Sequence, residues 1–157
     1  MFFIDPVILK SVMNVNSDQK MLSSILKTTQ MGQIGIRSVL DTSSMRPGLR
    51  KALQSQLREY DTIESEAHAI ASQRGWELKE VQPISRMMTD MATHMKLRRG
   101  NADSKIADMM IQGNTRGMVE SLKNLHQYQQ DDSQVRVLCQ RLLDCETANI
   151  RQMQPFL

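Results

Sequence analysis

Apolar residues recur at helical spacing in four long segments of this sequence, and proline or glycine residues separate these segments. Spacings of three and four residues place such side chains on one face of an α-helix, so each helix needs a partner against which to bury that face. The expected helices begin near residues 17, 47, 102 and 133 and end near residues 42, 74, 129 and 154. The sequence therefore predicts an all-α protein.

Proline, glycine and polar residues mark the expected helix ends. Pro47 suits a first helical turn, Gly75 suits a C-terminal cap with Trp76 folding back, and Pro155 ends the last helix. The polar stretch 14–17 is typical of a helix start. Residues 1–16 are therefore expected to form an apolar N-terminal arm, followed by a single bundle domain at residues 17–157.

The loop lengths predict how the helices are connected. Short loops after the first and third helices favour two antiparallel hairpins, and the long second connection holds an extra helix that begins after Pro83. A bundle with one long crossover is the ferritin-like arrangement. A chain of 157 residues suits one such domain. We expect a ferritin-like antiparallel four-helix bundle with an extra helix in the crossover.

Charge and cysteine usage exclude several classes of function. The chain has 20 basic and 17 acidic residues, a small excess, and the basic run at 96–99 has no interleaved aromatic residues, so nucleic-acid binding is not expected. No apolar run is long enough to span a membrane. Cys139 and Cys145 lie six residues apart on one expected helix, beyond disulfide reach, which predicts buried thiols in a cytoplasmic protein.

A ferritin-like metal centre needs inward Glu residues and Glu-x-x-His motifs, and the sequence holds only fragments of this pattern. Glu146 is followed by Asn149 where the histidine would stand, and Glu64 and His68 are four residues apart instead of three. Counting from the last loop places Glu146 opposite Gly117 or Met118, which supply no ligand. The only candidates for a residual metal site are Glu64, His68, Glu120, His126 and Glu146.

Neither a metal nor another cofactor is therefore expected. The sequence also lacks a nucleophile with a neighbouring base and a glycine-rich phosphate loop, so no catalytic residues are assigned and no enzyme activity is predicted. Tyr60 lies on the apolar stripe of the second helix and is interpreted as a core residue. Gly113 and Gly117 lie inside the third helix, which indicates a bend or a close helix contact.

Several short elements together resemble the ferritin-like spore coat protein F family of endospore-forming Firmicutes. They are Arg74-Gly75-Trp76, the helix opened by Pro83, the glycine-bearing helix with His126, and the ending Met153-x-x-Phe156-Leu157. The resemblance covers residues 20–157. It implies a non-enzymatic structural or assembly role, in the cytoplasm or the spore coat, with other coat proteins as partners. The alternative is a ferritin-like metal-binding protein with a degenerate site.

Two apolar segments exceed what a four-helix core can bury. They are the N-terminal arm at residues 1–13 and the methionine-rich face from Met87 to Met95. Large exposed apolar patches usually mark interfaces. The sequence thus predicts a homodimer or a larger homo-oligomer, and the competing interpretation is that both segments fold back over their own bundle.

Overall fold

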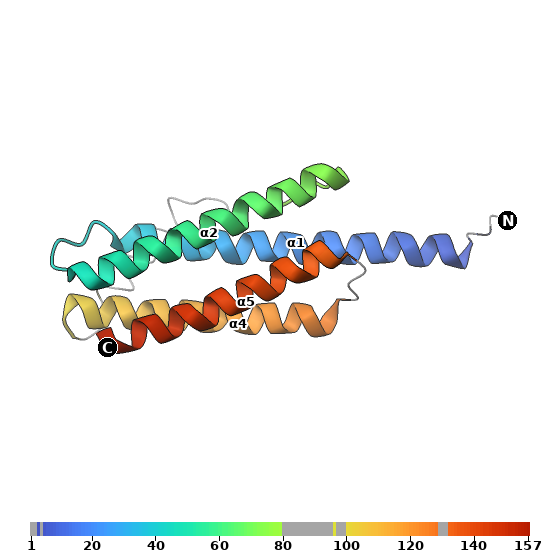
Figure 1. Cartoon of the computed structure of the whole chain (residues 1–157). Helices are drawn as coiled ribbons and strands as arrows, with labels where there is room; N and C mark the ends of the chain where they lie inside the picture. Colours follow the sequence, from blue (N-terminus) through green and yellow to red (C-terminus); the bar gives the residue numbers. More distant parts are fainter. Residues whose placement is uncertain (1–2, 4, 80–95, 97–99, 129–131) are drawn as a thin grey trace.

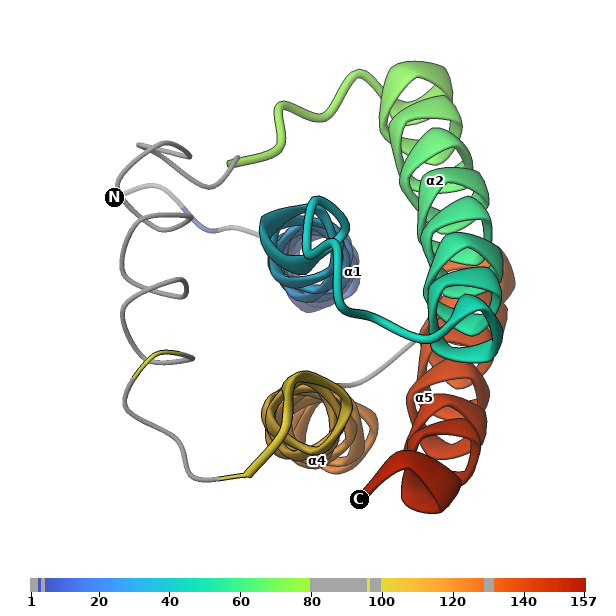
Figure 2. The ribbon, with the colours of Figure 1, turned by 90° about the vertical axis from the view of Figure 1, so that its left-hand side faces the viewer.

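The computed structural model describes residues 3, 5–79, 96, 100–128 and 132–157. Within these residues the long elements are α1 (Pro6–Val39), α2 (Pro47–Arg74), α4 (Ala102–Gln127) and α5 (Ser133–Met153), and the 3-10 turn η1 (Gln154–Phe156) follows α5. The four long helices lie along one another as a bundle (Figure 1). Viewed from its end, the bundle has α1 beside α4 and α2 beside α5 (Figure 2).

Helices that follow each other through short loops run antiparallel, whereas α2 and α4 run in the same direction (Figure 1). The end of α2 and the start of α4 therefore lie at opposite ends of the bundle (Figure 1). The prediction of an all-α, antiparallel four-helix bundle with one long crossover is confirmed. The crossover helix expected after Pro83, with its methionine-rich face, lies outside the described residues.

The first helix begins earlier than the sequence predicts. Asp5 caps α1 by accepting a hydrogen bond from the backbone N–H of Val7 at 2.8 Å, and Pro6 occupies the first turn. The expected start near Ser17 is wrong, because residues 6–16 already belong to α1. Asn and Ser reduce helix propensity by only a few tenths of a kcal/mol, about 0.7 at most, so a polar stretch does not end a long helix.

The C-terminal end of α2 forms as the sequence predicts. Gly75 adopts a left-handed conformation with φ of 68°, and the backbone N–H of Trp76 donates to the carbonyl oxygen of Ala71 at 2.9 Å. Arg74 pairs with Asp132, the N-cap residue of α5, and its guanidinium lies 5.8 Å from the centre of the Trp76 ring. This corner, formed by Arg74, Gly75, Trp76 and Asp132, therefore joins the end of α2 to the start of α5.

The core contains apolar side chains from all four helices. Cys139 and Cys145 are buried free thiols, as predicted, and burial raises their pKa values to about 11 and about 12. None of the described helices carries an apolar run that would cross a bilayer. The largest fully buried residues are Met21, Leu22, Ile25, Leu26, Ile36, Leu49, Leu53, Ile63, Ile106, Leu138, Leu142 and Met153.

Candidate functional site

A buried cluster of polar side chains interrupts this apolar core. The hydroxyl oxygen of Tyr60 lies 3.0 Å from Oε1 of Glu146 and 3.0 Å from Oδ1 of Asn114. Nδ2 of Asn149 donates to the Tyr60 oxygen at 3.3 Å and to Oδ1 of Asn114 at 3.2 Å. The four residues come from α2, α4 and α5, and all four are buried.

Each member of the cluster occupies a helix position that would otherwise hold an apolar residue. Tyr60 lies between Leu53 and Ile63 in the buried stripe of α2, and Asn149 lies between Leu142 and Met153 in that of α5. Burying polar groups without partners costs several kcal/mol, roughly 2–7 depending on the reference state. The cluster therefore reduces the stability that an all-apolar core would provide, unless its hydrogen bonds offset this cost.

Glu146 is the member whose hydrogen bonding is incomplete. Its side chain is 2% exposed, and its Oε2 atom is buried without a hydrogen-bond partner among the described residues. Burial raises the pKa of this carboxyl group to about 8, although the hydrogen bond from Tyr60 acts in the opposite direction. The group is consequently neutral in most molecules at pH 7. Burial and the neighbouring Glu146 also raise the pKa of Tyr60 well above its ordinary value.

Two glycines provide the space that the Tyr60 and Glu146 side chains occupy. A Cβ atom at Gly117 of α4 would lie 2.7 Å from Oε1 of Glu146, and one at Gly32 of α1 would lie 2.5 Å from Cζ of Tyr60. Gly117 thus meets the expectation of a close helix contact. Gly113 does not, because among the described residues no atom of a neighbouring element lies within 4 Å of the position of its Cβ.

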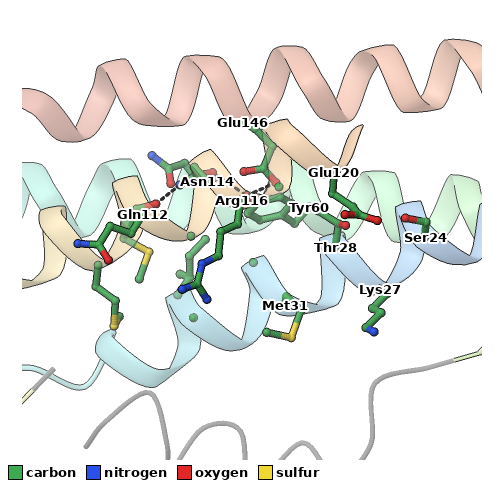
Figure 3. A pocket seen from close by; sticks show the side chains of 18 residues that line it. Ser24, Lys27, Thr28, Met31, Tyr60, Gln112, Asn114, Arg116, Glu120 and Glu146 are labelled. Atoms are coloured by element: carbon green, nitrogen blue, oxygen red, sulfur yellow. Dashed lines mark hydrogen bonds between the residues drawn. The ribbon is translucent and has the colours of Figure 1, made fainter. Parts of the chain in front are cut away.

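A pocket of about 580 Å³ lies between α1 and α4 and reaches this cluster. Figure 3 shows Tyr60 and Glu146 close together at its inner wall, with Arg116 reaching from α4 toward α1. The charged residues of its rim are Lys27, Arg116 and Glu120, all exposed. Its remaining lining residues are Ser24, Thr28, Met31, Gly32, Gly35, Ile36, Gln56, Met109, Met110, Gln112, Gly113, Asn114 and Gly117.

The structure brings only two of the five candidate metal-site residues to one place, because Glu120 and Glu146 line the same pocket. Glu64 accepts a hydrogen bond from Gln30 at 3.3 Å, and His68 is exposed on α2. His126 is exposed near the end of α4, beside a shallower second pocket. In the part of the chain that is described, no three His, Cys, Asp or Glu side chains are grouped closely enough to hold a metal ion.

Sequence reasoning missed three of the four cluster residues. Tyr60 was interpreted as a core residue, and Asn149 was considered only as a missing histidine; Asn114 was not singled out. The available signal was the placement of polar side chains at apolar-stripe positions on α4 and α5. Counting from the loop did place Glu146 opposite Gly117, and that prediction is confirmed.

Comparisons with known proteins relate the fold to one solved structure. No family model and no curated protein matches this sequence. The chain is similar to the crystal structure of a DUF305 fragment from Deinococcus radiodurans, with a TM-score of 0.69 and 15% sequence identity. The match covers 88% of this chain and 93% of the other. At this identity the likeness shows the all-α bundle fold alone.

The comparisons overturn the resemblance to the spore coat protein F family. The matching structure belongs to DUF305, which is a distinct family. The Arg74-Gly75-Trp76 corner, one of the elements that carried the resemblance, serves a general purpose in helical bundles, because it caps α2 and joins its end to the start of α5. A spore coat location and a sporulation role, and a ferritin-like relationship, find no support in these comparisons.

Proposed function

We propose that this protein is a non-enzymatic binding protein for a small organic molecule, which occupies the pocket between α1 and α4. The observation that carries the proposal is Oε2 of Glu146, a buried oxygen without a hydrogen-bond partner among the described residues, on a side chain that lines this pocket. Buried polar atoms are nearly always paired, so an unpaired atom beside a cavity favours a partner from outside the chain.

The size and lining of the pocket support this proposal. Its volume of about 580 Å³ lies within the range of small-molecule sites, which is roughly 300–1,000 Å³. Such sites combine a mostly apolar wall with a few polar groups that orient the ligand. Here Met31, Ile36 and Met110 supply apolar surface, while Tyr60 and Glu146 supply the polar groups.

Binding without catalysis is the simplest use of these groups. Burial raises the pKa of Tyr60 and of both cysteine thiols, so none of them is activated as a nucleophile near neutral pH. Glu146 would serve as an anchor that recognises the ligand by hydrogen bonding.

Filling the pocket from Gly113 tests the proposal. Gly113 lines the pocket and has open space around its Cβ position, so Gly113→Leu is expected to fold and to place a side chain in the ligand's volume. A chemically diverse compound library is screened by thermal shift against the wild type, Gly113→Leu, and the control Gly113→Ala. We expect compounds that raise the melting temperature of the wild type and of Gly113→Ala but not of Gly113→Leu.

A screen in which no compound raises the melting temperature of the wild type more than that of Gly113→Leu would contradict the proposal that the pocket is a binding site.

A second candidate function is assembly with another copy of the same chain. The start of α1 extends beyond the other helices (Figure 1), and its side chains Val7, Ile8 and Leu9 are 75%, 59% and 45% exposed. Phe3, just before the helix, is 88% exposed. Two identical helix ends that pair around a two-fold axis would bury this same apolar surface on both copies, which favours a homodimer.

The assembly candidate is tested by light scattering on the full chain and on Val7→Glu combined with Ile8→Glu. We expect a dimer for the wild type and a monomer for the double variant, because charged side chains in an apolar contact are not compensated. The control Val137→Glu places one negative charge on the exposed face of α5 and should leave the dimer intact. A wild-type monomer at high micromolar concentration would contradict this candidate.

A further inference from the structure

The hydrogen bonds of the buried cluster show which chemical group the pocket lacks. Tyr60 has one hydroxyl proton, which faces two acceptors, Oε1 of Glu146 and Oδ1 of Asn114, both at 3.0 Å. The amide protons of Asn149 are used by Tyr60 and Asn114. The Asn114 amide donates to the carbonyl oxygen of Met110 at 2.7 Å. Among the described residues no donor remains for Oε2 of Glu146, so the carboxylate form of this residue lacks a hydrogen-bond donor.

The rim of the pocket has a different character from its inner wall. Lys27 of α1 and Arg116 of α4 carry positive charges there, whereas Glu120 is the single acid. Within the described residues, none of these three side chains forms a salt bridge with another. Among the described residues of the rim, two cations against one anion leave a net positive charge, and such a charge favours an anionic group on the ligand.

Resting on the function proposed above, we propose that the ligand is a small amphoteric molecule, whose amine pairs with Glu146 and whose acidic group pairs with Arg116 and Lys27. The aliphatic part between these two ends would lie on Met31 and Met110, which line the pocket. An ammonium group carries three donors and no acceptor, which matches the surplus of acceptors at the cluster.

This pairing changes the protonation of Glu146. In the free protein burial holds a proton on its carboxyl group, whose pKa is about 8. The charged groups that face Glu146 across the pocket are Lys27, Arg116 and Glu120; Tyr60 and Cys145 are neutral at this pH. A bound ammonium favours the carboxylate, so the neutral acid and the cationic amine form an ion pair and one proton passes to the solvent.

The experiment is isothermal titration calorimetry of the full chain with ε-aminocaproate near neutral pH. Hexylamine and hexanoate are the matched compounds that carry only one of the two end groups, and γ-aminobutyrate tests a shorter spacing. Each titration is repeated in two amine-free buffers of different ionisation enthalpy, because the difference in heat reports the proton released. We expect one of the two amphoteric probes to bind about tenfold more tightly than hexylamine or hexanoate, with release of a proton.

Two variants test which side chain of the protein binds each end group of the ligand. Glu146→Gln is expected to weaken binding of the amphoteric probe about tenfold or more and to abolish proton release. Arg116→Gln is expected to weaken the same probe severalfold while leaving hexylamine unchanged. The control Asp144→Asn removes an exposed carboxylate from the same helix as Glu146 and should change neither result.

Failure of this inference is separable from failure of the proposed function. If hexylamine binds as tightly as the amphoteric probes and Arg116→Gln has no effect, the proposed pairing of an acidic group with Arg116 and Lys27 is wrong. If no amine binds, yet library compounds still discriminate the wild type from Gly113→Leu, the ligand class is wrong and the binding function stands. If no compound discriminates the wild type from Gly113→Leu, both the proposed ligand class and the proposed binding function are wrong.

Discussion

At the scale of single residues, Glu146 is the least conventional feature of the core. A carboxyl group with a pKa of about 8 is neutral in the folded chain at a pH where the same group in the unfolded chain, with an ordinary value of 4.5, is ionised. Between these two values the folded state holds a proton that the unfolded state has released. The free energy of unfolding therefore falls as the pH rises through this window.

This linkage predicts the behaviour of Glu146→Gln. The wild type should lose stability between about pH 5 and pH 8, by at most about 1.4 kcal/mol per pH unit, because ionisation of Glu146 is favoured only after unfolding. The Gln variant cannot ionise and offers an N–H donor to the acceptor-rich cluster. We expect it to be more stable than the wild type at pH 8 and to approach it at pH 5.

Urea unfolding across this pH range measures the effect. Asp144→Asn, on an exposed position of the same helix, is the control and should follow the wild-type curve. Wild-type and Glu146→Gln curves that run parallel from pH 5 to pH 8 would show that Glu146 ionises in the folded chain as it does in the unfolded chain.

At the scale of helices, two glycines that lie one turn apart on α4 have different surroundings. Gly117 lies against the carboxyl group of Glu146, whereas Gly113 faces the open pocket. The same distinction cannot be drawn from helix propensity, because glycine is equally unfavourable at both positions. What differs is the neighbouring helix: α5 presents a side chain to Gly117, whereas none of the other described elements has an atom within 4 Å of the Cβ position of Gly113.

The pair of variants Gly113→Ala and Gly117→Ala tests this arrangement. Gly113→Ala should stabilise the chain by up to about 1 kcal/mol, since Ala is the better helix former and meets nothing. Gly117→Ala should destabilise it by about 1–3 kcal/mol, because its Cβ would lie 2.7 Å from Oε1 of a buried side chain. Chemical unfolding at one pH measures both, and equal stabilisation by the two substitutions would contradict the packing of Glu146 on α4.

At the scale of the whole molecule, the candidate metal-site residues are spread over several parts of the bundle. Glu146 is in the core, Glu120 is on the pocket rim, and Glu64 and His68 lie on α2. The described part of the chain therefore offers no convergent set of three donors. The partners of Glu146 in the buried cluster are two amides and one phenol, which bind metal ions poorly and organic groups well.

From this distribution we expect protein purified without a metal-affinity tag to carry substoichiometric iron or manganese. Elemental analysis of the purified chain measures the metal content, and Glu146→Ala is the matched variant. Stoichiometric metal that disappears in Glu146→Ala would contradict this prediction and would restore the metal-binding alternative. A small signal that is equal in both proteins would agree with it.

The sequence by itself determined the helices, most of their ends and the register of the last hairpin. Periodic apolar residues define a helix face locally, and Gly75 and Pro155 end their helices through backbone geometry that needs no distant partner. Glu146 could be placed opposite Gly117 because a short loop sets equal heights on two antiparallel helices. The start of α1 was misplaced because a polar stretch is a weaker signal than the Asp5 cap with Pro6 behind it.

Only the tertiary structure decided what the core polar residues do together. Tyr60 reaches Glu146 and Asn149 across a contact between α2 and α5, which are separated by the long crossover, so no loop sets their relative height. The pKa of Glu146 depends on burial by neighbours from several helices. The pocket is lined by residues of all four long helices, including glycines of α1 and α4. Such properties arise from the relative placement of helices that are distant in sequence, and periodicity within one helix does not encode that placement.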